Sequence, residues 1–155
     1  MKEKIIEAIK KNNFIGWLYV QFLTCFYQIL DFFLVPKPKQ IIFTSFSGRQ
    51  FSDSPRIIFE ALKKDNKFSD FKFIWAFRNP SAFPEIDDSM KVDINSFDYL
   101  VTLLKSKYWI SNDSIERLTP INSKKHIYIN TWHGIPMKHL GPDEKNLEFI
   151  VKKLV

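Results

Sequence analysis

The sequence predicts an α/β fold in which a parallel sheet carries helices on both faces. From Gln40 onward, short apolar runs rich in β-branched and aromatic residues alternate with amphipathic stretches, a pattern typical of strands separated by helices. Hydrophobic residues make up 45% and aromatic residues 16% of the chain, which allows a packed core and argues against wholesale disorder. A length of 155 residues suits one compact domain plus an extra element.

An apolar segment, residues 14–35, precedes this pattern and is predicted to form a helix. Its polar residues are spaced by three, four and three positions and make one narrow stripe on a helix: Gln21, Thr24, Gln28 and Asp31. Pro36 and Pro38 are expected to end the helix. No small-residue cleavage site follows, so a secretory signal peptide fits poorly.

Three placements of this helix are open: in the plane of a membrane interface, packed on protein, or across a bilayer. A span is possible by length, since about 20 apolar residues suffice, but Asp31 and two glutamines are costly near the hydrocarbon centre. Lysines at both ends favour an interface with acidic lipids: Lys2, Lys4, Lys10, Lys11, Lys37 and Lys39. We therefore expect residues 1–39 to form a membrane-associating helical segment.

The region from residue 40 to 155 is expected to form the sheet and its helices. Apolar runs predict strands at residues 40–46, 71–77, 92–95, 108–112 and 126–131. Ser54 is expected to cap a helix that has Pro55 at its first position. Ser96 is expected to cap a second helix that runs to about residue 105, and a further helix is expected from about residue 145.

Polar and reactive residues follow the carboxyl ends of these strands, which is where open parallel sheets bind ligands. They occupy residues 45–49, 78–79, 111–113 and 132–134. The sequence therefore predicts that ligands bind at one edge of the sheet, beyond the carboxyl ends of its strands.

His133 is the best single candidate for catalysis at this edge. Its imidazole can remove a proton from an attacking hydroxyl, and Gly134 lets a substrate approach the backbone closely. The alternative is a histidine that hydrogen-bonds within its loop for shape alone. Lys138 is either a solvated lysine or a phosphate ligand, and His126, at the opposite end of its strand, is expected to be structural.

The loop after the first strand is a candidate phosphate site. Ser47, Gly48 and Arg49 lie between a strand and a helix, where backbone amides can hold an anion and a guanidinium can bind phosphate or carboxylate. The loop lacks the ending of a Walker loop and the glycines of a dinucleotide fingerprint, so an ordinary capped turn is the alternative. Asn112, at another strand end, can orient a substrate hydroxyl or make a turn.

Charge and cysteine content limit the partners. The 23 Lys+Arg and 17 Asp+Glu give a net charge of +6, which favours anionic partners. The lysines are scattered and no nucleic-acid motif is present, so no nucleic-acid partner is expected. The single Cys25 excludes an internal disulfide and a cysteine zinc site, and no metal site is expected.

Three segments, residues 45–55, 107–112 and 131–141, resemble the CDP-glycerol glycerophosphotransferase family of teichoic acid primases, polymerases and related capsule-forming enzymes. The resemblance runs from about residue 41 to 146. It implies a Rossmann-like, acceptor-side domain, the N-terminal half of a GT-B-type glycosyltransferase fold. It also implies that His133 is the general base, that CDP-glycerol or a similar CDP-polyol is the donor without a further cofactor, and that the protein is peripheral on the cytoplasmic face of the cell membrane.

The chain departs from the family pattern at Ile135, where threonine is usual, and at Ser54, where asparagine is usual. No donor-binding domain is expected within residues 40–155, so this chain is expected to be inactive alone and to need a C-terminal donor-binding domain. The other expected partners are a lipid-linked polyol-phosphate or glycan acceptor and an anionic membrane surface. Two alternatives are a non-catalytic membrane- or acceptor-binding module and a glycosyltransferase that uses a nucleotide sugar.

Overall fold

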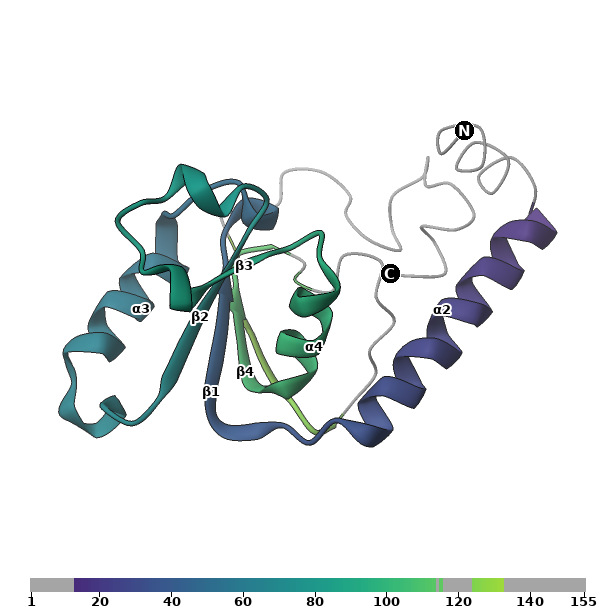
Figure 1. Cartoon of the computed structure of the whole chain (residues 1–155), viewed down its shortest axis with the longest axis horizontal. Coiled ribbons are helices and arrows are strands. Elements are labelled where there is room, and N and C mark those ends of the chain that lie inside the picture. The colour runs from purple at the N-terminus through teal and green to yellow at the C-terminus, as the bar shows by residue number, and fades with distance from the viewer. Residues whose placement is uncertain (1–12, 114, 116–123, 133–155) are drawn as a thin grey trace. The chain divides into compact units, whose positions relative to one another are not determined.

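Figure 1 shows the computed structural model of the chain, which describes residues 13–113, 115 and 124–132. The chain forms two compact units. The first comprises Met1–Leu30, Leu118–Asn122 and Gly134–Val155, and the second comprises Asp31–Arg117 and Ser123–His133. The helix expected from about residue 145 lies outside the described residues.

The described part of the first unit belongs to helix α2, Asn13–Phe33, which covers most of the apolar segment 14–35. The helix ends before Pro36, as expected for a residue that cannot donate a backbone hydrogen bond. Several of its large apolar side chains are exposed, among them Phe14, Phe22 and Ile29. No helix in the described ranges combines the length and apolarity that a membrane span needs.

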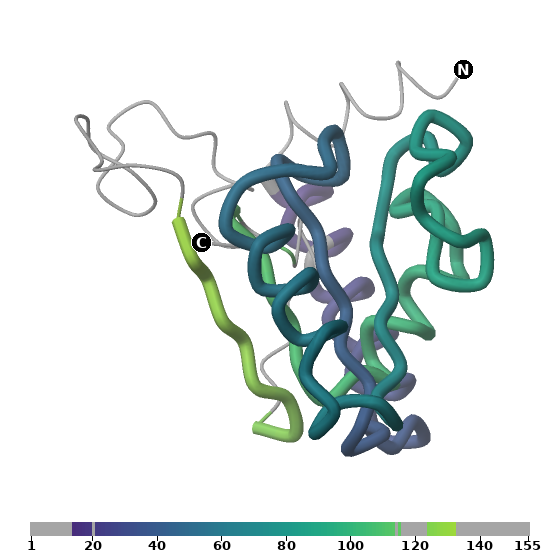
Figure 2. The backbone as a smooth tube through the Cα atoms, turned by 90° about the vertical axis from the view of Figure 1, so that its left-hand side faces the viewer, coloured from purple at the N-terminus to yellow at the C-terminus, as the bar shows by residue number. Residues whose placement is uncertain are grey.

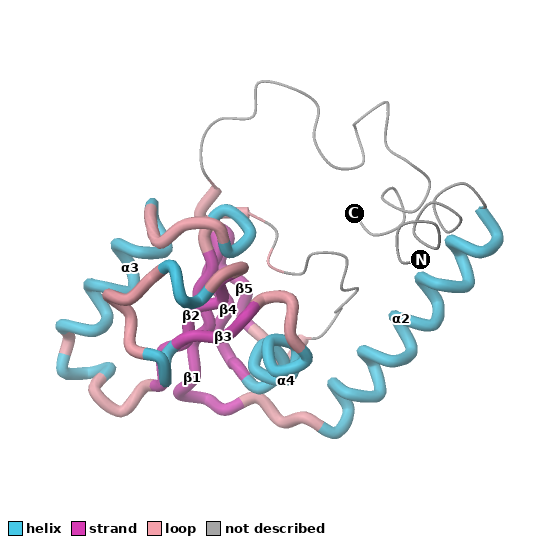
Figure 3. The backbone as a smooth tube through the Cα atoms, turned by 45° about the horizontal axis from the view of Figure 1, so that its top comes forward, coloured by secondary structure: helices cyan, strands magenta, loops and turns pink. Residues whose placement is uncertain are grey.

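The second unit is a parallel five-stranded sheet in the order β3-β2-β1-β4-β5, which confirms the predicted fold class. The strands are β1 Lys37–Thr44, β2 Lys72–Phe77, β3 Lys91–Asp93, β4 Ser106–Ser111 and β5 Ile127–Asn130. Helix α3, Asp53–Lys64, covers one face of the sheet and helix α4, Phe97–Lys105, covers the other (Figures 1 and 3). Strand β5 forms one edge of the sheet (Figure 2).

The helix caps were predicted with mixed success. Ser96 caps α4 as expected, because its side-chain oxygen accepts a hydrogen bond from the backbone N–H of Tyr99 at 3.1 Å. The prediction that Ser54 caps α3 is wrong, because Ser54 lies inside the helix and the cap position falls on Ser52. Asp53, between them, adopts a left-handed backbone with φ of 62°.

An aromatic cluster fills the space between the sheet and α3. Trp75 on β2 is fully buried and stacks between Phe43 and Phe77, with ring centroids 5.4 and 5.6 Å away. Phe51 and Phe59 meet the indole edge-on at 4.8 and 5.8 Å. Since these rings come from two strands, a loop and a helix, the cluster fixes α3 against the sheet.

The amino edge of β4 and β5 is held by a buried histidine. The ring of His126 stacks on Trp109 with centroids 4.4 Å apart, and its Nδ1 lies 2.7 Å from the carbonyl oxygen of Ser106. Its Nε2 lies 3.4 Å from a carboxylate oxygen of Asp31. These contacts fit the structural role expected for His126, at the edge opposite the strand carboxyl ends.

Candidate functional site

The strand order places a topological switch point between β1 and β4. The chain passes from β1 outward through β2 to β3 and then returns to the other side of β1 as β4. Thr44 and Ser111, the last residues of β1 and β4, are paired in register. In doubly wound sheets this crevice beyond the carboxyl ends is the place where ligands bind. Two of the predicted site segments, after β1 and after β4, therefore lie side by side.

The turn after β1, Phe46–Gly48, runs through three left-handed residues, with φ of 48° at Phe46, 55° at Ser47 and 78° at Gly48. Residues other than glycine adopt such angles only at a cost of about 1–3 kcal/mol each, so the surrounding structure must hold them there. At Gly48, a Cβ atom would lie 3.0 Å from the backbone nitrogen of Arg78, which follows β2. The absent side chain thus makes room for the protein's own backbone.

Asn112, directly after β4, holds this turn from the switch-point side. Its side chain is fully buried, its Oδ1 accepts the backbone N–H of Phe46 at 2.8 Å, and its Nδ2 donates to a carboxylate oxygen of Asp53 at 2.7 Å. Phe46 and Asp53 are two of the left-handed residues. The described contacts of Asn112 are therefore those of a residue that positions the loop.

Asp113 adds a second link between the same two segments. One of its carboxylate oxygens accepts the hydroxyl of Ser47 at 2.6 Å, and the other accepts the hydroxyl of Ser111 at 3.1 Å. The sequence placed Asp113 at a strand carboxyl end but did not indicate these two partners. Ser47 and Asn112, both predicted site residues, are thus brought together by β1 and β4.

Two arginine side chains also hydrogen-bond to the turn. Arg49 donates through Nε to the carbonyl oxygen of Phe46 at 2.9 Å, and Arg78 donates through Nε to that of Ser47 at 3.0 Å. Backbone amides in the turn are already engaged, since Gly48 donates to Ser45 and Arg49 to Phe46. Anion binding by this loop, through backbone amides or through the guanidinium group of Arg49, stays a prediction.

The predicted catalytic loop begins at the same edge. The backbone N–H of Thr131 donates to the carbonyl oxygen of Ser111 at 2.8 Å, which carries the end of β5 alongside β4. Trp132 then turns into a left-handed backbone with φ of 56°. The next predicted site residues, His133, Gly134 and Lys138, lie outside the described residues.

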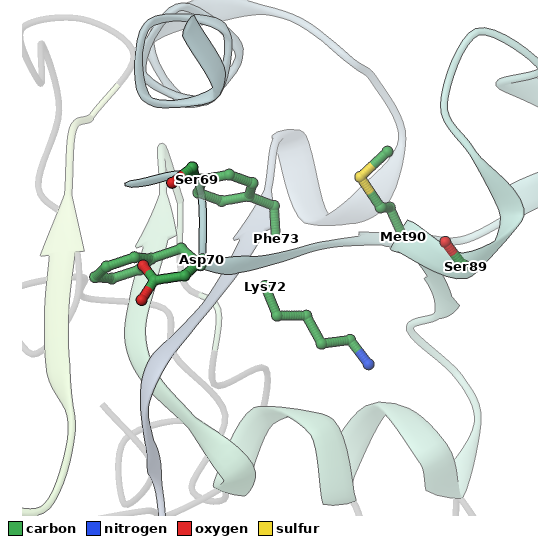
Figure 4. Close-up of a pocket in the computed structure, with 7 residues that line it drawn as sticks. Ser69, Asp70, Lys72, Phe73, Ser89 and Met90 are labelled. Atoms are coloured by element: carbon green, nitrogen blue, oxygen red, sulfur yellow. The ribbon is translucent and has the colours of Figure 1, made fainter. Parts of the chain in front are cut away.

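Two surface hollows lie at the opposite, amino edge of the sheet. One of about 450 Å³ lies at the starts of β2 and β3, and in Figure 4 the side chains of Lys72 and Met90 point away from one another there. The other, of about 340 Å³, lies beside Val35 and Lys107. Neither hollow is lined by a predicted site residue, so the chemistry at the carboxyl edge remains the better guide to function.

Within the described part of the chain, three exposed carboxyl groups have a lowered pKa. A hydrogen bond from Arg56 lowers the pKa of Glu60, and one from Lys39 lowers that of Asp70. Hydrogen bonds from Ser89 lower the pKa of Asp87. Such shifts on exposed groups reflect local pairing and carry little stability.

Strand order, switch point and a strained polar loop together define a doubly wound α/β domain of the Rossmann-like type found in GT-B transferases. The chain belongs to the CDP-glycerol:poly(glycerophosphate) glycerophosphotransferase family, whose model matches residues 26–153.

Relatives of known name support this membership. A teichoic acid poly(glycerol phosphate) polymerase of Staphylococcus epidermidis is 38% identical over 112 residues, covering 70% of this chain and 15% of that protein. A polymerase of the same name from Bacillus spizizenii is 34% identical over 151 residues, covering 92% of this chain and 34% of that protein. The chain thus spans about a third or less of the length of these relatives.

Solved structures agree with the fold. A variant of the wall teichoic acid polymerase TagF superposes with a TM-score of 0.65 at 31% identity, covering 76% of this chain and 29% of that one. A TagF variant soaked with CDPG gives a TM-score of 0.63 at 28% identity, covering 93% of this chain and 36% of that one. The GT-B-type assignment of this α/β domain is therefore confirmed.

Proposed function

We propose that this chain provides the acceptor side of a transferase that moves glycerol phosphate, or a related polyol phosphate, from a CDP-activated donor to a membrane-linked acceptor. The observation that carries the proposal is the family match over residues 26–153. The matched region includes both the turn after β1, Phe46–Gly48, and the segment around His133. The acceptor is a lipid-linked polyol-phosphate or glycan chain, and the product belongs to teichoic acid or a related cell-wall polymer.

The proposed reaction is a phosphoryl transfer in which no group stays on the protein. The acceptor hydroxyl oxygen attacks the β-phosphorus of the CDP-polyol while His133 removes its proton. A phosphodiester bond forms, the bond from that phosphorus to the bridging oxygen breaks, and CMP leaves. Positioning and electrostatic stabilisation do most of the work in such transfers, so the loop beyond β1 contributes by holding phosphate oxygens.

The proposed domain organisation has two parts. The segment that associates with the cytoplasmic face of the membrane ends before Lys37, where β1 begins, and the residues from Lys37 onward form the acceptor-side domain. The donor-binding domain is supplied by further polypeptide, because the relatives are several times longer than this chain. Exposed aromatic side chains on α2 and lysines in the segment support the membrane part of the proposal.

A chimera tests the transferase function. Residues 26–153 would replace the matched segment of the Bacillus spizizenii polymerase, and extension of a glycerol-phosphate primer from CDP-glycerol would be measured. We expect the chimera to extend the primer above the level seen with the donor-binding half alone, because this chain then completes the active site. A folded chimera that binds CDP-glycerol but leaves the primer unextended would overturn the proposal.

Vesicle flotation tests the membrane segment. The chain is expected to float with vesicles that contain anionic lipid, and Phe22→Asp is expected to weaken that partitioning roughly 10-fold or more, since burying a phenylalanine contributes about 1.5–3 kcal/mol. Gln21→Asp, which adds the same charge on the polar stripe, is the matched control and should have a smaller effect. Equal losses in the two variants would contradict insertion of the apolar face.

A further inference from the structure

Two arginines from different strand ends are anchored to consecutive carbonyl groups of one turn. Arg49 follows the turn and Arg78 follows β2, yet their Nε atoms donate to the carbonyl oxygens of Phe46 and Ser47 at 2.9 and 3.0 Å. The backbone N–H of Arg78 also donates to the carbonyl oxygen of Gly48 at 2.7 Å. The two guanidinium groups therefore attach to adjacent points of a turn that β2 and β4 hold rigid.

Each guanidinium keeps most of its binding capacity. The group has five N–H donors in a fixed plane, and the anchoring bond uses one of them on an uncharged acceptor. Both side chains are exposed, and neither pairs with a carboxylate among the described residues. Arg56 differs, because its Nε lies 2.7 Å from Glu60 and its charge is already compensated. Arg49 and Arg78 are thus positively charged and oriented, with donors left for an anion.

The two acidic groups of the loop have hydrogen-bond partners other than the arginines. Asp53 accepts from Asn112, which follows β4, and Asp113 accepts from Ser47 and from Ser111 at the end of β4. Like charges repel at close range, so a phosphate is directed away from these carboxylates and toward the guanidinium groups.

We propose that Arg49 and Arg78 form a paired guanidinium site for a phosphate ester anion of the substrate, in which Arg78 is a binding residue of equal weight to Arg49. The proposal rests on the proposed function and deepens it. Two substrates carry this chemistry, namely the phosphodiester chain of the acceptor and the diphosphate of the donor. A bidentate contact from a planar guanidinium to phosphate oxygens is the interaction expected at each arginine.

Calorimetric titration of the 155-residue chain tests the pair. The probes are a synthetic glycerol-phosphate oligomer, CDP-glycerol and inorganic phosphate. Arg49→Ala and Arg78→Ala are each expected to weaken the preferred probe about 10-fold or more, because each removes charge-assisted hydrogen bonds. Arg56→Ala removes the same charge elsewhere and is expected to change the affinity less than about 2-fold.

Arg78→Gln separates binding from folding. The glutamine amide N–H can still donate a hydrogen bond to the carbonyl oxygen of Ser47, although the positive charge is lost. An unchanged Tm of this variant would confirm that the loop is folded. Affinity equal to that of the unmodified chain in Arg78→Gln, or an equal loss in Arg56→Ala, would overturn the pair, as would a chain that binds none of the probes. Preference for the oligomer assigns the site to the acceptor, and preference for CDP-glycerol assigns it to the donor.

The titration of the arginine variants and the activity of the chimera test the two proposals independently. If the arginine variants lose binding while the chimera is inactive, the pair stands and the transferase proposal fails. If the chimera extends its primer and the arginine variants bind like the unmodified chain, the pair alone is overturned.

Discussion

Replacement of His133 by alanine is expected to lower primer extension by the chimera about 100- to 10,000-fold, the range by which a positioned general base contributes. The reason is that the acceptor hydroxyl then attacks without losing its proton to the protein. The preceding Trp132 follows β5, whose end lies beside the carboxyl end of β4. CDP-glycerol affinity should be unchanged, since the proposed base acts on the acceptor.

His126→Ala is the matched control for this experiment. That ring lies against Trp109 at the amino edge, so its loss should lower stability without changing turnover per folded molecule. Turnover within a few-fold of normal in His133→Ala, measured at saturating CDP-glycerol, would remove His133 from the reaction and leave the loop as a binding element.

Replacement of Trp75 by alanine is expected to lower the free energy of unfolding by about 3–5 kcal/mol, the largest stability effect expected in this chain. The indole is fully buried and touches aromatic rings from β1, β2, α3 and the loop before α3. Its loss leaves a cavity that rigid rings cannot close. Urea unfolding followed by circular dichroism measures the change.

Trp75→Phe is a sharper version of the same test. The indole Nε1 is buried without a hydrogen-bond partner among the described residues, and an unsatisfied buried donor costs about 1–3 kcal/mol. Phenylalanine keeps one stacked ring and removes that donor, so the loss of volume is partly offset and a change within about 1 kcal/mol is expected. A loss as large as that of alanine would contradict this expectation.

The elements of the sheet were predictable because each depends on residues close together in the chain. Apolar runs placed the five strands to within a few residues, and Ser96 signalled the start of α4 through a local hydrogen bond. The carboxyl edge was predictable for the same reason, since strand direction follows from a parallel sheet. Ser47, Gly48, Arg49 and Asn112 do follow the carboxyl ends of β1 and β4, as the sequence predicted.

The contacts within the site depend on strand order, which local patterns do not specify. Asn112 meets Phe46 across 66 positions, and Arg78 meets Ser47 across 31. The cap prediction at Ser54 failed for a related reason. Asn112 holds the side chain of Asp53, whose left-handed backbone sets the entry into α3. A tertiary contact overrode a strong local signal there.

The contacts of the left-handed turn at Phe46–Gly48 also bear on the order in which the site forms during synthesis. Its supports come from residues that are synthesised after it, at the ends of β2 and β4. A nascent chain that has emerged only as far as β2 carries Ser47 and Arg49 without the contact from Asn112. The turn gains that contact only after β4 is synthesised, and any ligand that binds the turn stabilises strands distant in the sequence by linkage.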